Sequence, residues 1–450
     1  MTDAGAVLLS GGHLIDPARG AGHDAPADVL VRDGRIAGVG QGLDAGGDAP
    51  VEIVDCAGLV VSPGFIDLHV HLREPGREDA ETIETGSRAA ALGGFTAVCP
   101  MPNTDPPADN AGVVEMVAAR GREVGLVDLF PVGAVTLGRH GNALAELGAM
   151  ARSSAAVDCF SDDGSPIREA RLLRRALEYA RAFDAVIADH CEDATLTDGA
   201  QMHEGELSGL LGLRGWPAAA EDMIVARDLM LAELTGGRLH LCHLSTAGAV
   251  ELVRSAKARG VHVTAEVTPH HLSLTDQALA EYDPVYKVNP PLRGKADVEA
   301  LRAGLADGTI DAIATDHAPH AREAKEVELA QAPPGMLGLE TALAVVLTDL
   351  VSPGWLTLAQ AVERLTTGPA RCRRIPGHGG PLVAGAPANL TVFDPAARWT
   401  VRPEALASRS RNTPFAGRQL HGRVVHTLLR GRFSVRDGSI NESRDGVVRR

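Results

Sequence analysis

The feature that most constrains this chain is an eightfold alternation of short apolar runs with longer segments of helical period. Such alternation is typical of parallel strand–helix units, because parallel strands need a crossover connection that a helix supplies. The expected strands cover residues 64–69, 95–100, 128–132, 155–160, 185–190, 239–243, 261–266 and 311–316. Helical segments follow them, for example at 81–92, 168–181, 221–234 and 248–259.

Eight such units without a glycine-rich dinucleotide fingerprint favour a closed (β/α)₈ TIM barrel over a doubly wound sheet. The 450 residues leave room for a small second domain. Both chain ends contain short β-rich runs with Asp-Gly turns, at Asp33-Gly34 and at Asp437-Gly438. We therefore predict an α/β protein in which residues 63–372 form the barrel, while residues 1–62 and 373–450 together form a small β-sandwich.

Composition excludes several classes of protein. The formal charge is −15 and the basic residues form no stripe, so nucleic-acid binding is not expected. The six cysteines show no C-x-x-C spacing, which argues against a disulfide framework and a zinc knuckle. A recognisable signal sequence and an apolar run of 18 residues are both missing. These observations predict a cytoplasmic protein that does not enter a membrane.

Polar residues gather where the predicted strands end, which in a barrel is the face that carries the chemistry. His69 and His71 have equal parity, so they can hold a metal together. Three later strands end in the pairs Asp189-His190, Cys242-His243 and Asp316-His317. Imidazoles and carboxylates are ligands that suit zinc, so the sequence predicts a zinc site at these strand ends.

Side-chain parity within a strand separates predicted ligands from predicted structural residues. In the strand 239–243, residues 239, 241 and 243 share a face, so His243 points inward and His240 points outward. Cys191 and Cys242 lie on the wrong parity for ligands, and we predict buried apolar roles for both thiols.

Longer segments resemble those of bacterial class I dihydroorotases, which belong to the amidohydrolase superfamily. They are DLHVHLREPG (67–76), CPMPNTDPP (99–107), FSDDG (160–164), MHEGELSGLLGLRGWPAAAED (202–222), CHLSTAGAVELVR (242–254), VTAEVTPHHL (263–272), KVNPPLR (287–293), ATDHAPH (314–320) and GMLGLETAL (335–343). The likeness extends from Gly11 to Phe433. It implies the reversible zinc-dependent cyclisation of N-carbamoyl-L-aspartate to (S)-dihydroorotate and water, the third step of de novo pyrimidine synthesis.

The resemblance also implies a set of metal ligands. One metal would be bound by His69, His71 and Asp316, and a second by His190 and His243, with an aspartate of FSDDG between them. We assign this bridge to Asp162, because Asp163 would point the other way on an extended strand. One or two zinc ions per subunit are expected, and two are favoured.

The same resemblance assigns catalytic and substrate-binding roles. Asp316 would take a proton from the attacking water and pass it to the departing nitrogen. The planar fork of Arg73 would bind the substrate α-carboxylate. The predicted substrate-binding residues are His71, Arg73, Asn103, Asn289, His320, Pro334 and Gly335.

Two alternatives stay open at this point. Dihydropyrimidinases, hydantoinases and allantoinases share the barrel, but normally bridge their metals with a carboxylated lysine at the fourth strand. Here all four lysines (Lys257, Lys287, Lys295 and Lys325) follow that strand, which disfavours these relatives. The other alternative is an inactive scaffold of aspartate transcarbamoylase, which the complete set of ligands disfavours. We expect an active enzyme that acts on a small molecule and forms homo-oligomers, and association with that transferase is compatible with this expectation.

Overall fold

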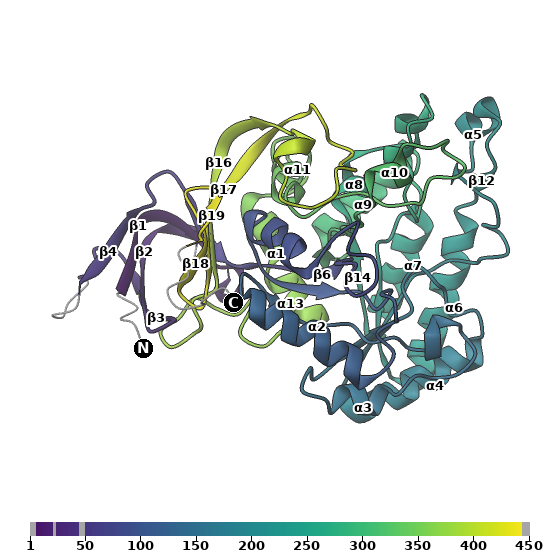
Figure 1. Cartoon of the computed structure of the whole chain (residues 1–450), viewed down its shortest axis with the longest axis horizontal. Helices are drawn as coiled ribbons and strands as arrows, with labels where there is room; N and C mark the ends of the chain where they lie inside the picture. Colours follow the sequence, from purple (N-terminus) through teal and green to yellow (C-terminus); the bar gives the residue numbers. More distant parts are fainter. Residues whose placement is uncertain (1–5, 21–23, 45–49, 443–450) are drawn as a thin grey trace.

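The computed structural model describes residues 6–20, 24–44 and 50–442, arranged as a barrel with surrounding helices and a β-rich part at one side (Figure 1). The β-rich part contains the first strands of the chain, drawn in purple, beside the last strands, drawn in yellow-green. All six cysteines are buried with free thiols. None of the helices in the described ranges has the length and hydropathy needed to cross a bilayer.

Eight parallel strands form the barrel. They are β6 (Phe65–Val70), β7 (Phe95–Pro100), β8 (Asp128–Leu129), β9 (Cys159–Ser161), β10 (Val186–Asp189), β13 (Arg238–Leu241), β14 (Val263–Val267) and β15 (Ala312–Ile313). One sheet has the order β6-β7-β8 and the other β9-β10-β13-β14-β15. Isolated parallel bridges, Gly133↔Phe160 and Val70↔His317, join these sheets at both edges. The strands therefore follow one another around a ring, which confirms the predicted (β/α)₈ barrel.

Helices follow the barrel strands and cover the outside of the ring. The longer ones are α1 (Ile83–Leu92), α2 (Ala111–Val124), α4 (Ala170–Ala180), α6 (Ala219–Thr235), α7 (Ala247–Ala258), α9 (Lys295–Asp307) and α12 (Leu358–Leu365). The chain also forms shorter helices, which are α3 (Leu147–Ala151), α5 (Glu206–Leu211), α8 (Pro269–Ser273), α10 (Arg322–Lys325), α11 (Ala342–Val346) and α13 (Thr367–Cys372). Thr82, Asn110 and Thr246 cap α1, α2 and α7 by accepting a backbone N–H, which stabilises the first turn of each helix. The short strands β11 (Met202–His203) and β12 (Gly215–Trp216) pair with each other outside the ring.

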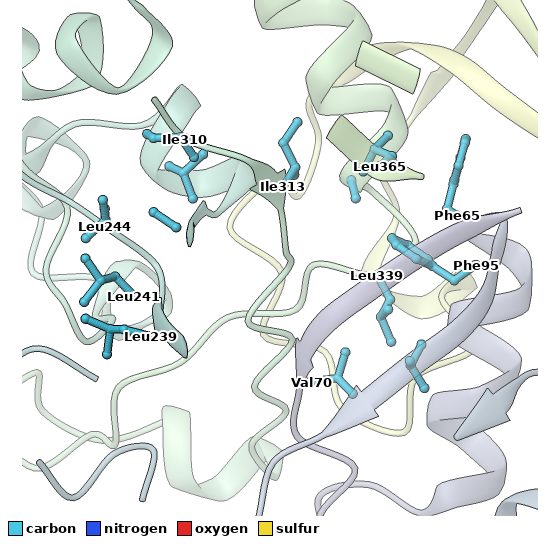
Figure 2. Close-up of a cluster of buried hydrophobic side chains, with 14 of the residues drawn as sticks. Phe65, Val70, Phe95, Leu239, Leu241, Leu244, Ile310, Ile313, Leu339 and Leu365 are labelled. Carbon is cyan, nitrogen blue, oxygen red and sulfur yellow. The ribbon is translucent and has the colours of Figure 1, made fainter. Parts of the chain in front are cut away.

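The aliphatic core divides between the outside and the inside of the ring. Phe65, Val70 and Phe95 belong to the cluster between strands and helices, together with Leu239 and Leu241 of β13 (Figure 2). A second cluster, which includes Ile66, Leu68, Ala97, Cys99 and Ala188, is formed by the alternate residues of the strands. Since Leu239 and Leu241 face the helices, the residue between them must face the interior of the ring.

This arrangement corrects the prediction for His240. The side chain does not point outward, because His240 is hydrogen-bonded to Thr264 Oγ1 at 2.8 Å and donates to Glu266 Oε2 at 3.0 Å, both on the neighbouring strand β14. It is 5% exposed. The outward orientation was predicted from alternation with His243, but His243 lies beyond the end of β13, where the alternation no longer applies.

The two chain ends pair in one mixed sheet. Its strands are β1 (Ala6–Ile15), β2 (Asp24–Arg32), β3 (Arg35–Gly40), β4 (Val51–Asp55), β5 (Val60–Pro63), β16 (Leu390–Thr400), β17 (Gln419–Leu429), β18 (Arg432–Arg436) and β19 (Ser439–Ile440). Antiparallel pairing of β5 with β16 joins the two ends, as expected. Both Asp-Gly turns connect hairpins, with φ of 48° and 76° at Asp33 and Gly34. The domain boundaries at residues 62 and 372 stay a prediction, and residues 1–5, 21–23, 45–49 and 443–450 of the predicted domain lie outside the described residues.

Candidate active site

A buried cluster of four histidines and two aspartates lies at the carboxyl ends of the barrel strands. Each side chain comes from the last residues of a strand or from the turn that follows it. The cluster consists of His69 and His71 at β6, Asp163 after β9, His190 after β10, His243 after β13 and Asp316 after β15. All six residues are at most 5% exposed. The ring therefore brings together side chains that are far apart in the sequence.

Asp163 lies at the centre of this cluster. Its Oδ1 is 3.3 Å from His69 Nε2, 3.4 Å from His243 Nε2 and 3.6 Å from His190 Nδ1. Its Oδ2 is 3.5 Å from His71 Nε2. One carboxylate thus contacts both pairs of histidines.

The structure corrects our assignment of the bridge to Asp162. The Asp162 carboxylate points away from the histidines and accepts hydrogen bonds from the backbone N–H groups of Val135, at 2.9 Å, and Thr136, at 3.0 Å. It also accepts a hydrogen bond from the Thr136 hydroxyl. Strand alternation does not apply to these residues, because β9 ends at Ser161 and neither aspartate lies on an extended strand.

Asp316 completes the cluster from the last strand. Its Oδ1 lies 3.0 Å from His71 Nε2 and 3.6 Å from His69 Nε2. Asp316 and His243 have φ values of 46° and 31°, in the left-handed region that residues with a Cβ rarely adopt. Strain of this kind is common at functional sites, and here it accompanies the turns that aim both side chains at the cluster.

The charges in the cluster stabilise one another. Burial alone would raise the pKa of Asp163, but His69 and the hydrogen-bonding histidines outweigh burial and hold this pKa well below its usual value. Burial would lower the pKa of His190, whereas its contacts with Asp163 and Glu192 raise that pKa to about 10. A dry site with this many carboxylates and imidazoles is a place where a cation is expected.

The donor atoms also fit a metal ion. His69, His71 and Asp163 offer ligand atoms that all lie within 4.8 Å of one another, and so do Asp163, His190 and His243. The buried Nε2 of His69 has no hydrogen-bond partner among the described residues. Nitrogen and carboxylate oxygen are the ligands that zinc takes in catalytic sites. Because Asp163 belongs to both groups, the geometry accommodates a bridged pair as well as a single ion.

A second layer of residues orients these imidazoles. Glu266 Oε1 lies 2.8 Å from His69 Nδ1, while its Oε2 contacts His240. Glu192 Oε2 lies 3.0 Å from His190 Nε2 and accepts a hydrogen bond from Asn289 Nδ2 at 3.2 Å. Carboxylates behind imidazoles fix the ring orientation and the tautomer of metal ligands. Glu266 and Glu192 were not predicted from the sequence, although a charged residue at the end of an apolar strand was a usable signal for Glu266.

Arg73 lies beside the cluster with the properties of an anion-binding residue. It is 6% exposed, and its Nε donates to the Pro319 carbonyl at 3.1 Å. Burial and the neighbouring Arg77 lower the pKa of Arg73 to about 10, against the attraction of Asp316 and Asp163. In the described part of the chain no carboxylate lies within 4.0 Å of the guanidinium. The predicted carboxylate-binding group is therefore buried without a protein carboxylate as partner.

The other predicted substrate-binding residues lie on several loops. Asn103 Oδ1 is 2.8 Å from His71 Nδ1, which ties it to the cluster. Asn289 Oδ1 and His320 Nδ1 are both buried without a hydrogen-bond partner among the described residues. These two atoms are available to a polar ligand.

The backbone at Pro334-Gly335 already has protein partners. His320 Nε2 lies 2.8 Å from the Pro334 carbonyl, and the Gly335 N–H donates to the Lys287 carbonyl at 2.9 Å. Gly335 has a φ of 143°, and a Cβ there would approach His320 Nε2 to 2.7 Å. The glycine therefore allows the close approach that positions His320.

Comparisons with known proteins agree with this geometry. A family model described as dihydro-orotase-like matches residues 58–249. The dihydroorotase of Streptomyces coelicolor is 56% identical over 415 residues, which cover 92% of this chain and 96% of the relative. The dihydroorotase of Mycobacterium tuberculosis is 54% identical, with 95% and 99% covered.

Solved structures show the same fold. The L-hydantoinase (dihydropyrimidinase) of Arthrobacter aurescens superposes with a TM-score of 0.85 at 27% identity, and 98% of each chain is covered. The dihydropyrimidinase of Brevibacillus agri has a TM-score of 0.82 at 23% identity, with 97% of this chain and 96% of that chain covered. The fold is thus common to several cyclic amidohydrolases, whereas the high identities are to dihydroorotases. The chain belongs to the dihydroorotase family of the amidohydrolase superfamily.

Proposed function

We propose that the chain catalyses the reversible zinc-dependent cyclisation of N-carbamoyl-L-aspartate to (S)-dihydroorotate and water, the third step of de novo pyrimidine synthesis. The observation that carries this proposal is near-full-length identity of 56% to a dihydroorotase in a chain whose buried cluster is complete. This identity extends over 415 residues, more than the predicted barrel alone contains.

Zinc would be held by His69, His71 and Asp316 at one position and by His190 and His243 at the other, with Asp163 between them. When bound, zinc polarises a carbonyl and lowers the pKa of water, which makes hydrolysis and its reversal possible near neutral pH. Two ions are favoured because Asp163 contacts both pairs of histidines.

Asp316 would move the proton. Burial favours its neutral form, but the hydrogen bond from His71 and the charge of His69 outweigh burial and hold the pKa of Asp316 below its usual value. The residue is then an ionised base before hydrolysis. Its carboxylate would accept a proton from the attacking water and donate it to the departing ring nitrogen, and cyclisation would use the same path in reverse.

Arg73 would bind the α-carboxylate of the substrate. A planar guanidinium can form two parallel hydrogen bonds with a carboxylate, and burial strengthens such a pair. Asn103 and His320 would assist it. His71, Asn289 and the Pro334-Gly335 segment would contact the ring or the ureido group, with the Pro334 carbonyl using its second lone pair.

The positions of the lysines argue against a carboxylated-lysine enzyme. Lys257 Nζ pairs with Asp311 at 2.6 Å, and Lys295 is an exposed residue near Glu299. Lys287 and Lys325 bind backbone carbonyls. After the fourth barrel strand, β9, the chain supplies Asp163 directly. The hydantoinase-like alternative therefore lacks its bridging residue.

A cytoplasmic location, homo-oligomerisation and association with aspartate transcarbamoylase stay predictions.

The decisive experiment follows the absorbance of dihydroorotate with purified protein whose metal content is measured. We expect turnover that depends on bound zinc, and no comparable turnover of dihydrouracil or hydantoin. Because cyclisation takes up one proton, the equilibrium ratio of dihydroorotate to N-carbamoyl-L-aspartate should increase about tenfold for each unit by which the pH is lowered. A zinc-loaded protein without turnover of dihydroorotate would support the inactive scaffold instead.

A further inference from the structure

The segment 320–335, called here the 320–335 loop, carries His320 at one end and Pro334 and Gly335 at the other. The two ends contact each other, because His320 Nε2 lies 2.8 Å from the Pro334 carbonyl. The position of His320 therefore depends on how the end of the loop is held.

Two lysines hold this loop through backbone carbonyls. Lys325 Nζ donates to the carbonyls of Pro333 at 2.8 Å, Pro284 at 3.0 Å and Lys287 at 3.4 Å. Lys287 Nζ donates to Leu329 at 2.8 Å and to Ala330 at 3.3 Å. In the described ranges, no carboxylate lies within 4.0 Å of either ammonium.

Placing an ammonium among carbonyls without a carboxylate is costly. Lysine usually keeps its charge in water or beside an acid. Burial, and then the positive charge of Lys287, lower the pKa of Lys325 to about 7, and only Asp283 opposes them. Lys325 lines a cavity of about 420 Å³, whose other charged or titratable lining residues include His320, Arg322, Glu326, Glu404 and Arg411. Arg322 and Glu326 pair with each other, so neither neutralises the ammonium.

We propose that Lys325 is a positioning residue that holds Pro333, and through it Pro334, Gly335 and His320, in the geometry that binds substrate. This inference rests on the proposed function, which gives His320 and the Pro334-Gly335 segment their role. It adds a residue that does not itself contact the substrate.

The protonation state of Lys325 determines how well it can do this. An ammonium has three N–H donors for the three carbonyls, whereas a neutral amine has two donors and a lone pair that would face an acceptor. Above neutral pH the loop should loosen, so the KM for dihydroorotate should increase with pH.

The first test compares Lys325→Met with the control Lys295→Met, whose lysine side chain is 85% exposed. At pH 6.5, Lys325→Met should raise the KM for dihydroorotate about tenfold, the usual effect of losing a charged hydrogen-bond group, with kcat changed less than about threefold. The control should match the wild type. Between pH 6.5 and 8.5 the wild-type KM should rise, while Lys325→Arg should keep a constant KM because arginine stays charged.

The second test needs no turnover. A glutamate-specific protease should cut the loop after Glu323, Glu326 or Glu328 several-fold faster in Lys325→Met than in Lys295→Met. Wild-type protein should be cut faster at pH 8.5 than at pH 6.5, after correction with a reference peptide, which tests the idea even if the variant does not fold.

The outcomes separate this inference from the proposed function. Wild-type protein without dihydroorotase activity would refute the function, whereas the cleavage rates would still decide whether Lys325 holds the loop. If Lys325→Met had the same KM and the same cleavage rate as the wild type, the inference would be overturned. A raised KM with unchanged cleavage would also overturn it, because Lys325 would then contact the substrate directly.

Discussion

Two neighbouring aspartates at the end of β9 have different partners and therefore different expected functions. Asp163 lies among the four histidines, whereas Asp162 binds the backbone at Val135 and Thr136. Asp163→Ala should lose bound metal and activity together, because the histidine pairs lose their common anion. Asp162→Ala should keep most of its metal but lose about 1–3 kcal/mol of stability, since two buried N–H groups lose their acceptor. Metal analysis and thermal unfolding of both variants measure this contrast.

The opposite pattern would restore Asp162 as the bridge. That pattern is a metal-free Asp162→Ala protein beside a fully loaded and active Asp163→Ala protein. Retention of metal and activity by both variants would show that neither aspartate bridges two ions.

Glu340 provides a prediction about pH and stability. It accepts hydrogen bonds from the N–H groups of Ala407 at 2.9 Å and Ser408 at 3.3 Å. Burial, assisted by the negative charge of Glu81, raises the pKa of Glu340 from 4.5 to about 7. Below pH 4.5 the carboxyl is neutral in both states. As pH rises from 4.5 to 7, ionisation stabilises the unfolded chain first, so the folded state loses stability over this range.

Glu340→Gln keeps an acceptor oxygen and cannot ionise. The Tm of the variant minus the Tm of the wild type should therefore be larger at pH 8 than at pH 5. In unfolding free energy, this change in the difference between the two proteins should be about 1–3 kcal/mol. The exposed Glu281 serves as control, and Glu281→Gln should show no such trend. Equal Tm differences at both pH values would show that Glu340 ionises normally in the folded protein.

At the residue scale, the sequence was sufficient to predict that His69, His71, His190, His243 and Asp316 lie close together. It was insufficient to predict which of Asp162 and Asp163 points toward the histidines, or how His240 is oriented, because alternation along a strand predicts orientation only as far as the strand extends. The residues of the cluster lie at or beyond strand ends, where residues in the left-handed region such as His243 and Asp316 turn the chain. Such turns depend on contacts with neighbouring strands, which local sequence does not reveal.

At the scale of elements, all eight barrel strands lie where apolar runs predicted them, but several are shorter than expected. The strand predicted at 128–132 is observed as Asp128–Leu129, and that predicted at 311–316 as Ala312–Ile313. Both lie next to an edge where the ring is joined by an isolated bridge. Apolar character identifies a buried segment, whereas the length of a strand depends on the partner that supplies its hydrogen bonds.

The two junctions of the barrel lead to a prediction about metal removal. At one junction, the Gly133 N–H donates to the Cys159 carbonyl at 3.1 Å and the Ser161 N–H donates to the Gly133 carbonyl at 2.8 Å. At the other junction, the His71 N–H donates to the His317 carbonyl at 2.8 Å. The proposed ligands lie on both sides: Asp163 follows β9, while His71 and Asp316 flank the other junction. Chelation should therefore increase amide hydrogen exchange at these junctions more than in the β10–β13 ladder, which has four paired positions.

Hydrogen exchange measured by mass spectrometry with and without chelator tests this. A uniform increase over all barrel strands, or none at the junctions, would show that bound metal does not connect the two sheets.

At the scale of the whole molecule, the pairing of both chain ends has a consequence for synthesis. Ser62 on β5 and Thr391 on β16 are 329 residues apart, yet their strands are hydrogen-bonded neighbours. On the ribosome, β5 must wait until almost the entire chain has emerged, and during that interval its edge is open to other nascent chains. The edge of β5 is covered only when β16 pairs with it. A chain released before β16 is made would carry an unprotected edge that chaperones can recognise.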